Sequence, residues 1–180
     1  MKTFFLPLLS LAAFTAFTSH AAELNSKLDD DGKSLRLSAG GKPVFQYNHA
    51  PVARPALKNE NHTRNAYLHP VWTPSGKIIT DEWCGFGGDA HWHHRGIWFA
   101  WTSTKINGKP HDFWNIGAGS GKVFFKSFAG KSADGSGFVT EHEWRVGGGV
   151  TNTTYGDVVL RERWNVKLVD ATPQQFVFDI

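Results

Sequence analysis

The sequence predicts an all-β protein whose fold is an antiparallel β-sandwich. Short apolar or alternating runs recur between turn signals, and no window of about eleven residues shows the period of an amphipathic helix. Nineteen Gly and 8 Pro residues favour many turns. A hydrophobic content of 41% with a net charge of only +3 excludes a disordered chain. The same small charge argues against a phosphate-neutralising surface, so no nucleic-acid partner is expected.

The expected strands follow the chain in order. Residues 35–38 and 44–47 flank Gly40 and Gly41 and should form a hairpin. The run at residues 97–101 is apolar throughout, so it should be a central strand covered on both faces. The other expected strands are residues 66–72, 123–128, 138–146, 157–169 and 175–180.

Residues 1–22 have the pattern of a secretory signal peptide. Lys2 precedes an apolar run at residues 4–17 that is too short to span a bilayer. The small residues Ser19 and Ala21 stand where a signal peptidase cleaves. We therefore expect an exported protein, periplasmic or extracellular, with no membrane span after signal removal.

Residues 23–180 are expected to form one β-sandwich domain. The last residues, 175–180, alternate like a strand up to the final position. An unfinished apolar strand at a terminus is unfavourable because its exposed edge invites aggregation. The domain is therefore expected to be the N-terminal part of a longer one.

The segment 69–115 holds five of the nine His residues. If the chain around residue 92 is extended, His91 and His93 point to one face and His94 to the other. Two imidazoles on one face could begin a site for a divalent metal ion, so His91 and His93 are the candidate metal ligands. Candidates for a third ligand are Glu82, Asp89, His111 and Asp112.

The same segment could hold a small-molecule or glycan ligand. Trp faces stack on pyranose rings, while His, Asp and Arg side chains bond hydroxyl groups. The expected substrate-binding residues, which would line one cleft, are His91, Trp92, His93, Arg95, His111 and Asp112. The alternative is that these aromatic residues belong to the core and that the His residues bond loop carbonyls.

The two long runs near the C-terminus place one ionisable residue each on a mainly apolar face. These are His142 and Glu162, and they come together if the runs pair through the turn between them. An inward His and Glu could serve as acid and base, so both are the candidate catalytic residues. Sugar mutarotase-like sandwiches use such a pair, which by fold analogy suggests a mutarotase-like supersandwich. The alternative is a buried pair with a structural role.

Three sequence blocks, "YLHPVWTPSG", "HWHHRGIWFAW" and "DFWN", occur here in order. Together they resemble the PmoA-like family, a domain of unknown function often labelled methane oxygenase PmoA. The resemblance covers about residues 65–180. It implies an exported bacterial protein, common in organisms that degrade polysaccharides, and a domain longer than this chain.

These observations favour an exported carbohydrate-active protein that binds or acts on a sugar through a cleft of His, Trp and Arg residues. Two alternatives stay open. The protein could be a non-catalytic glycan-binding module, or a metal-dependent oxygenase or hydrolase that uses His91 and His93. The sequence leaves open whether the protein is an enzyme.

Overall fold

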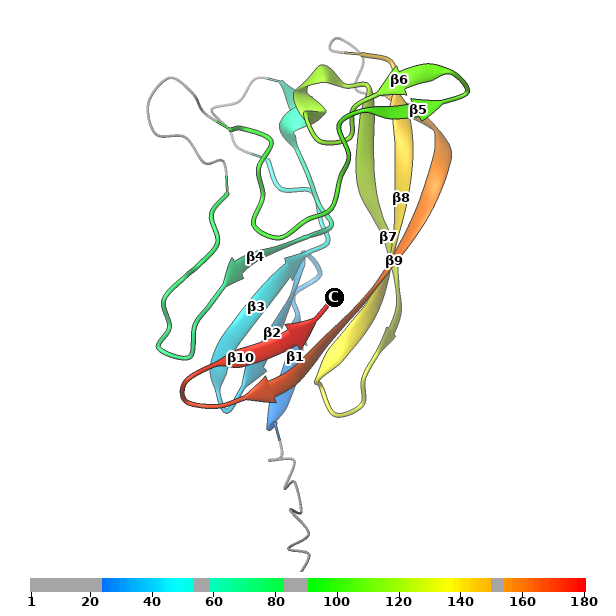
Figure 1. The fold of residues 1–180 in the computed structure, drawn as a ribbon. Coiled ribbons are helices and arrows are strands. Elements are labelled where there is room, and N and C mark those ends of the chain that lie inside the picture. The colour runs from blue at the N-terminus through cyan, green and yellow to red at the C-terminus, as the bar shows by residue number, and fades with distance from the viewer. Residues whose placement is uncertain (1–23, 54–58, 83–90, 150–153) are drawn as a thin grey trace, which may run out of the picture.

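The computed structural model of the chain describes residues 24–53, 59–82, 91–149 and 154–180. The expected signal peptide, residues 1–22, lies outside the described residues. Within them the all-β class is confirmed: antiparallel strands form two four-stranded sheets and one small hairpin (Figure 1). In the described residues the helical elements are two short 3-10 turns.

The first sheet has the order β1-β2-β3-β4 and contains the expected hairpin. Its strands are β1 (Ser26–Asp30), β2 (Ser34–Ala39), β3 (Lys42–Asn48) and β4 (Tyr67–Val71). Gly40 and Gly41 connect β2 to β3 with φ values of 56° and 78°, a conformation that residues with a Cβ adopt rarely. The turn residues therefore fix the hairpin where the sequence predicted it.

The second sheet has the order β10-β9-β8-β7 and contains the longest strands. They are β7 (Gly121–Lys131), β8 (Gly137–Gly147), β9 (Tyr155–Ala171) and β10 (Phe176–Asp179). The remaining elements are the hairpin β5 (Thr104–Ile106) and β6 (Lys109–His111), and the 3-10 turns η1 (Glu60–His62) and η2 (Ile116–Ala118). The alternating polar and apolar residues of β8 and β9 follow from the sheet: one face is buried and the other meets water.

The main core lies between the two sheets. Leu37, Phe45 and Tyr47 of the first sheet and Val166 and Leu168 of the second are all fully buried in it. The long strands β7, β8 and β9 extend past the first sheet, and the segment around residues 91–120 runs beside that extension (Figure 1). Burial of these apolar side chains is the main force that holds the sheets together.

The expectation of a central strand at residues 97–101 is wrong. Only Ile97 pairs with the first sheet, through an isolated bridge to Leu68. Beyond it the chain is irregular, and Ala100 packs with Trp144 in a second apolar cluster. Phe99 and Trp101 are 47% and 45% exposed. The apolar run at residues 97–101 is therefore not a strand. Its side chains pack over the end of the second sheet, and its backbone does not join either sheet beyond Ile97.

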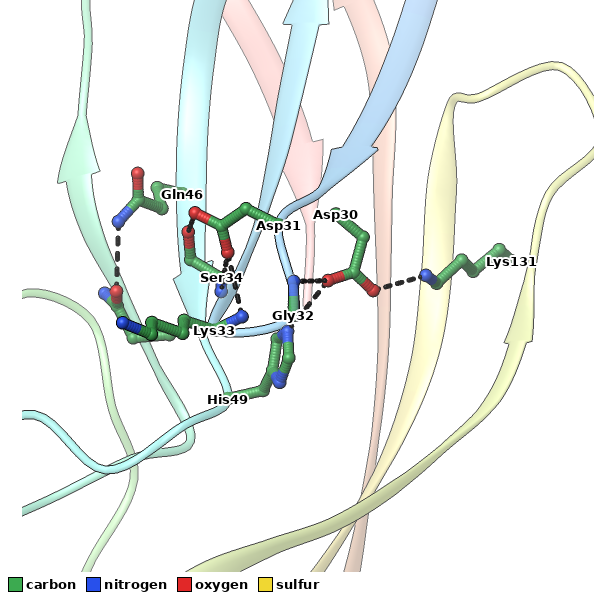
Figure 2. A network of polar contacts seen from close by, with 9 residues as sticks. Asp30, Asp31, Gly32, Lys33, Ser34, Gln46, His49 and Lys131 are labelled. Atoms are coloured by element: carbon green, nitrogen blue, oxygen red, sulfur yellow. Dashed lines mark hydrogen bonds and ion pairs between the residues drawn. The ribbon is translucent and has the colours of Figure 1, made fainter.

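An ion pair ties the edges of the two sheets together at Asp30. The Asp30 carboxylate accepts a hydrogen bond from Lys131 Nζ at 2.7 Å and from the backbone N–H of Gly32 at 3.0 Å. His49 Nε2 lies 3.1 Å from the same carboxylate (Figure 2). Asp30 ends β1, whereas Lys131 ends β7, so one carboxylate joins residues a hundred positions apart in sequence.

No helix in the described part of the chain has the length and apolar character that crossing a bilayer requires.

Candidate functional site

The segment after residue 90 is a turn, not the extended chain that the sequence suggested. The backbone N–H of His94 donates to the carbonyl of His91 at 3.0 Å. That bond folds the chain back on itself, so His94 stands beside His91 with ring centroids 4.8 Å apart and planes 8° apart. The expectation that His94 points away from His91 is therefore wrong.

Three imidazoles gather at this turn. One ligand nitrogen from each of His91, His93 and His94 lies within 4.8 Å of the others. The ring of His93 stands edge-on to His94 at 4.5 Å and to His91 at 5.8 Å. This histidine cluster (His91, His93 and His94) is partly open, since His91 is exposed and the other two are half-buried.

The indole rings of Trp98 and Trp114 pack beside the histidine cluster. Trp114 lies 5.6 Å from His94 and 6.2 Å from His93, measured between ring centroids. Trp98 packs on Trp114 at 4.4 Å and lies 6.3 Å from His94. The indoles reduce the access of water to the imidazoles on this side. Trp92, another predicted binding residue, stays exposed at the turn.

The surroundings favour neutral imidazoles. Burial lowers the pKa of His93 to about 4, and the neighbouring His94 and His91 act in the same direction, against the opposing charge of Asp112. Burial also lowers the pKa of His94, with His91 contributing. A neutral imidazole has a free lone pair, which is the form that binds a metal ion.

The other candidate ligands are bonded elsewhere. His111 Nδ1 lies 2.9 Å from the carbonyl of Ser120. The Asp112 carboxylate accepts bonds from the backbone N–H groups of Trp114 and Asn115, at 2.8 and 2.9 Å. Glu82 accepts a bond from the Tyr67 hydroxyl at 2.8 Å. Asp89 lies outside the described residues. Among the described residues, the group of close ligand atoms at this site comprises the three histidines.

Arg95 holds the turn in place. Its side chain is fully buried and donates to the carbonyls of Trp92, His94 and His62 at 2.8, 2.7 and 2.6 Å. The contact with His62 anchors the turn to the segment before β4. The hydrogen bonds to these three carbonyls position the histidine cluster, and the contact of Arg95 with a ligand stays a prediction.

Gly96 allows the chain to leave the turn. Its φ of 35° is unfavourable for residues with a side chain, and an added Cβ would overlap the carbonyl oxygen of Leu68. The backbone of Ile97 then pairs with Leu68 of β4. The histidine cluster is therefore attached to the first sheet directly after Arg95.

The predicted catalytic pair comes together as expected, on strands β8 and β9. The register places His142 opposite Glu162, and Nδ1 of His142 lies 2.9 Å from Oε2 of Glu162. Because a carboxylate only accepts, we assign the proton to Nδ1. The other nitrogen, Nε2, then accepts from the Tyr47 hydroxyl at 2.7 Å. The result is a chain of hydrogen bonds from the first sheet to the second.

The two members of this pair differ in their exposure to solvent. The His142 side chain is 0% exposed, whereas that of Glu162 is 13% exposed. Burial favours a higher pKa for Glu162, but the hydrogen bonds, first of all that from His142, outweigh it and the pKa is lowered. Trp144 Nε1 also donates to this carboxylate at 3.2 Å. Glu162 is thus a charged group with partial access to solvent, and His142 is held inside.

Exposed aromatic rings lie near Glu162. Trp101 packs on Trp144 at a centroid distance of 4.9 Å, and Phe99 packs on Trp101 at 5.5 Å. Phe99 and Trp101 form what we call the aromatic patch. Sequence reasoning assigned both residues to a central strand and so missed their exposure. The dense aromatic run itself was the only signal that could have pointed to them.

Sequence reasoning also missed His94 as a partner of His91. The signal was present in the block His91-Trp92-His93-His94, because a turn over these four residues brings His94 back beside His91. The turn itself depends on Arg95 and Gly96, whose roles are set by contacts with distant segments.

Comparisons with known proteins place the chain in a family without assigning a role to any residue. No solved structure matches this chain, and no curated protein does. One family model matches residues 34–180, and its description is "Family of unknown function (DUF6807)". The resemblance to the PmoA-like family is therefore wrong, since the matching model is that of DUF6807 and nothing links it to PmoA. The chain belongs to the DUF6807 family of unknown function.

Proposed function

We propose that this protein is an exported, metal-dependent, carbohydrate-active protein whose histidine cluster binds a divalent metal ion. The observation that carries the proposal is the approach of three imidazole ligand atoms to within 4.8 Å of one another. Three neutral imidazoles bound to one ion leave coordination positions for water and a substrate, as in catalytic zinc sites. A metal ion in such a site can polarise an oxygen of the substrate or activate a bound water.

The aromatic surroundings support a sugar as the substrate class. Trp92 is exposed at the turn itself, and the aromatic patch of Phe99 and Trp101 offers two further ring faces. Aromatic faces give a flat apolar surface to the C–H face of a pyranose. Hydroxyl groups of a sugar are also hard oxygen ligands of the kind that divalent ions bind.

A titration of the metal-free chain with Zn²⁺ and Mn²⁺ tests the proposal, with binding followed by calorimetry. The wild-type chain should bind one ion, and His93→Ala should lose that binding. The matched control is His111→Gln, since His111 is close in sequence but bonds Ser120 and stands outside the cluster. No saturable binding, or equal loss in both variants, would overturn the metal site.

Export is supported by the segment at residues 1–22. Mass spectrometry of the mature protein should find an N-terminus at Ala22 or Glu23. Recovery of the protein with its intact Met1 would contradict export.

The aromatic patch favours a second candidate function, glycan binding without catalysis. Phe99 and Trp101 would hold a pyranose on their ring faces. The Glu162 carboxylate, which accepts a hydrogen bond from Trp144, would lie close to this sugar. Trp101→Ala should then abolish sugar binding and leave metal binding unchanged. Sugar turnover that needs the metal would exclude this purely binding function.

A further inference from the structure

A cavity lies beside β7 and the turn η1, and no residue of the histidine cluster lines it. Its volume is about 260 Å³, and most of the residues that line it have polar side chains. Two of the lining side chains are the cations Arg64 and Lys122, and the neutral donors and acceptors include Asn61 and Tyr155. Among its described lining residues the one carboxylate belongs to Glu60, which is exposed.

Arg64 is buried without hydrogen bonds to balance its charge. It is 1% exposed, and its Nε and Nη1 atoms have no hydrogen-bond partner. Its guanidinium stacks on Trp98 at 4.0 Å. A buried donor with no acceptor is costly, and a buried charge is more costly still. An anion bound in the cavity that Arg64 lines would reduce the cost of its buried charge.

Lys122 adds a second buried cation. It is 6% exposed, and its Nζ donates to the carbonyl of Asn61 at 3.2 Å while lying 5.5 Å from the ring of Tyr155. Burial, together with the charges of Arg64 and Arg95, lowers the pKa of Lys122 to about 8. Arg64 and Lys122 thus line one cavity, and among the described residues neither forms an ion pair with a carboxylate.

We propose that this cavity binds a compact oxyanion, phosphate or sulfate, between Arg64 and Lys122. The planar fork of a guanidinium matches two oxygens of such an anion, and an ammonium adds a point charge. The anion comes either free from solution or as a group on a sugar, and the cavity volume leaves room for more than the bare ion. This site does not use the histidine cluster and stands whether or not a metal binds there.

Calorimetric titration of the full chain with sodium phosphate and sodium sulfate tests the site, with a chelator present so that no metal ion contributes. Saturable binding is expected, and Lys122→Met should weaken it at least about ten-fold, the effect of losing one charge-assisted contact. Lys122→Arg should retain binding. The matched control is Lys105→Met, because Lys105 is an exposed lysine outside the cavity.

Glu60 provides a variant that does not disturb the buried cations. Removing its negative charge in Glu60→Gln should tighten phosphate binding, because the side chain lines the cavity from an exposed position. The Glu60→Gln titration tests whether the anion binds in this cavity even if Lys122→Met fails to fold. A comparison of glucose 6-phosphate with inorganic phosphate then identifies the source: tighter binding of the sugar phosphate indicates a sugar-borne group, and equal or weaker binding indicates the free ion.

The proposal is overturned by any of three results. These are no saturable binding of either anion, equal affinity in wild type and folded Lys122→Met, and unchanged affinity in Glu60→Gln. Equal weakening in Lys105→Met would show that the effect comes from overall charge and not from the cavity, and would overturn it as well.

Discussion

His94 lies parallel to His91, with ring planes 8° apart and centroids 4.8 Å apart. The backbone bond between the same two residues sets this relationship, since it closes the turn that returns His94 to its neighbour. Arg95 then fixes the turn by donating to three carbonyls. The histidine cluster is therefore held in place by a backbone hydrogen bond and by the buried cation of Arg95.

The first prediction separates the turn from an extended chain. His94→Ala should weaken binding of Zn²⁺ as much as His91→Ala does, and by more than the roughly 10–100-fold that losing a second-shell partner costs. In an extended segment His94 would face away, and its loss would leave metal affinity unchanged. Competition against a chromophoric chelator measures both variants, and an unaffected His94→Ala would show that His94 is no ligand.

The second prediction concerns Gly96, which ends the turn. Gly96→Ala combines a positive φ with a Cβ that overlaps the carbonyl of Leu68 and lies 2.8 Å from the Cβ of His69. The cost should exceed the strain of about 1–2 kcal/mol that an unfavourable φ carries by itself. Gly108→Ala is the control, because its φ is also positive, at 77°, but nothing lies within 4 Å of the added Cβ. Urea unfolding compares them, and equal losses would contradict the crowding at Gly96.

A third prediction addresses the buried pair on β8 and β9. His142→Ala removes the partner of both the Glu162 carboxylate and the Tyr47 hydroxyl. The free energy of unfolding should fall by about 2–4 kcal/mol, because each of these two groups loses the shorter of its hydrogen bonds and a void remains. Glu141→Ala, on the same strand but the opposite face, should cost less than about 0.5 kcal/mol.

A further variant, Glu162→Gln, decides whether Glu162 has a role beyond structure. If it contacts a sugar, Glu162→Gln should lower sugar binding or turnover more than it lowers stability. An unfolding free energy that is equal in wild type and His142→Ala would show that the hydrogen-bond chain from Tyr47 to Glu162 is not stabilising.

The fourth prediction is a dependence of stability on pH that arises from Asp30. Burial favours a higher pKa for this carboxyl, but bonds from Lys131, the Gly32 backbone and His49 outweigh it and lower the pKa to about 2. The folded state therefore binds its proton less readily than the unfolded state does. Stabilisation from this group is complete above the usual pKa of 3.8 and is lost as the pH falls toward 2.

Unfolding measured across that acid range checks the effect. Asp30→Asn should remove part of the acid destabilisation and should also lower stability at neutral pH. Asp29→Asn is the control, since Asp29 pairs with an exposed Lys27 on the outside of the sheet. Identical acid profiles for wild type and Asp30→Asn would refute the role of the cross-sheet ion pair.

Local patterns were enough to predict the long strands. Alternation along β8 and β9 is a property of the strand itself, so the pairing of His142 with Glu162 followed from two short windows of sequence. Hairpin glycines such as Gly40 likewise act through their own φ. The long strands and the hairpin depend on few distant contacts, so they can be predicted from the sequence.

Features that depend on distant contacts were not predictable in this way. The apolar run that contains Phe99 and Trp101 has the composition of a buried strand, but it covers the end of β7 and β8, and composition does not distinguish these cases. The turn that gathers the histidine cluster needs Arg95 to reach His62, which is 33 residues away. The cavity with Arg64 and Lys122 joins segments that no local pattern relates.

The central claim is that three histidines of this chain bind one divalent ion, and X-ray absorption spectroscopy at the zinc edge tests it most directly. The zinc-loaded chain should show three imidazole nitrogens at about 2.0–2.1 Å, with the remaining ligands from water. His94→Ala should reduce the imidazole count to two. A spectrum with only oxygen ligands, or an imidazole signal that His94→Ala leaves unchanged, would contradict the claim.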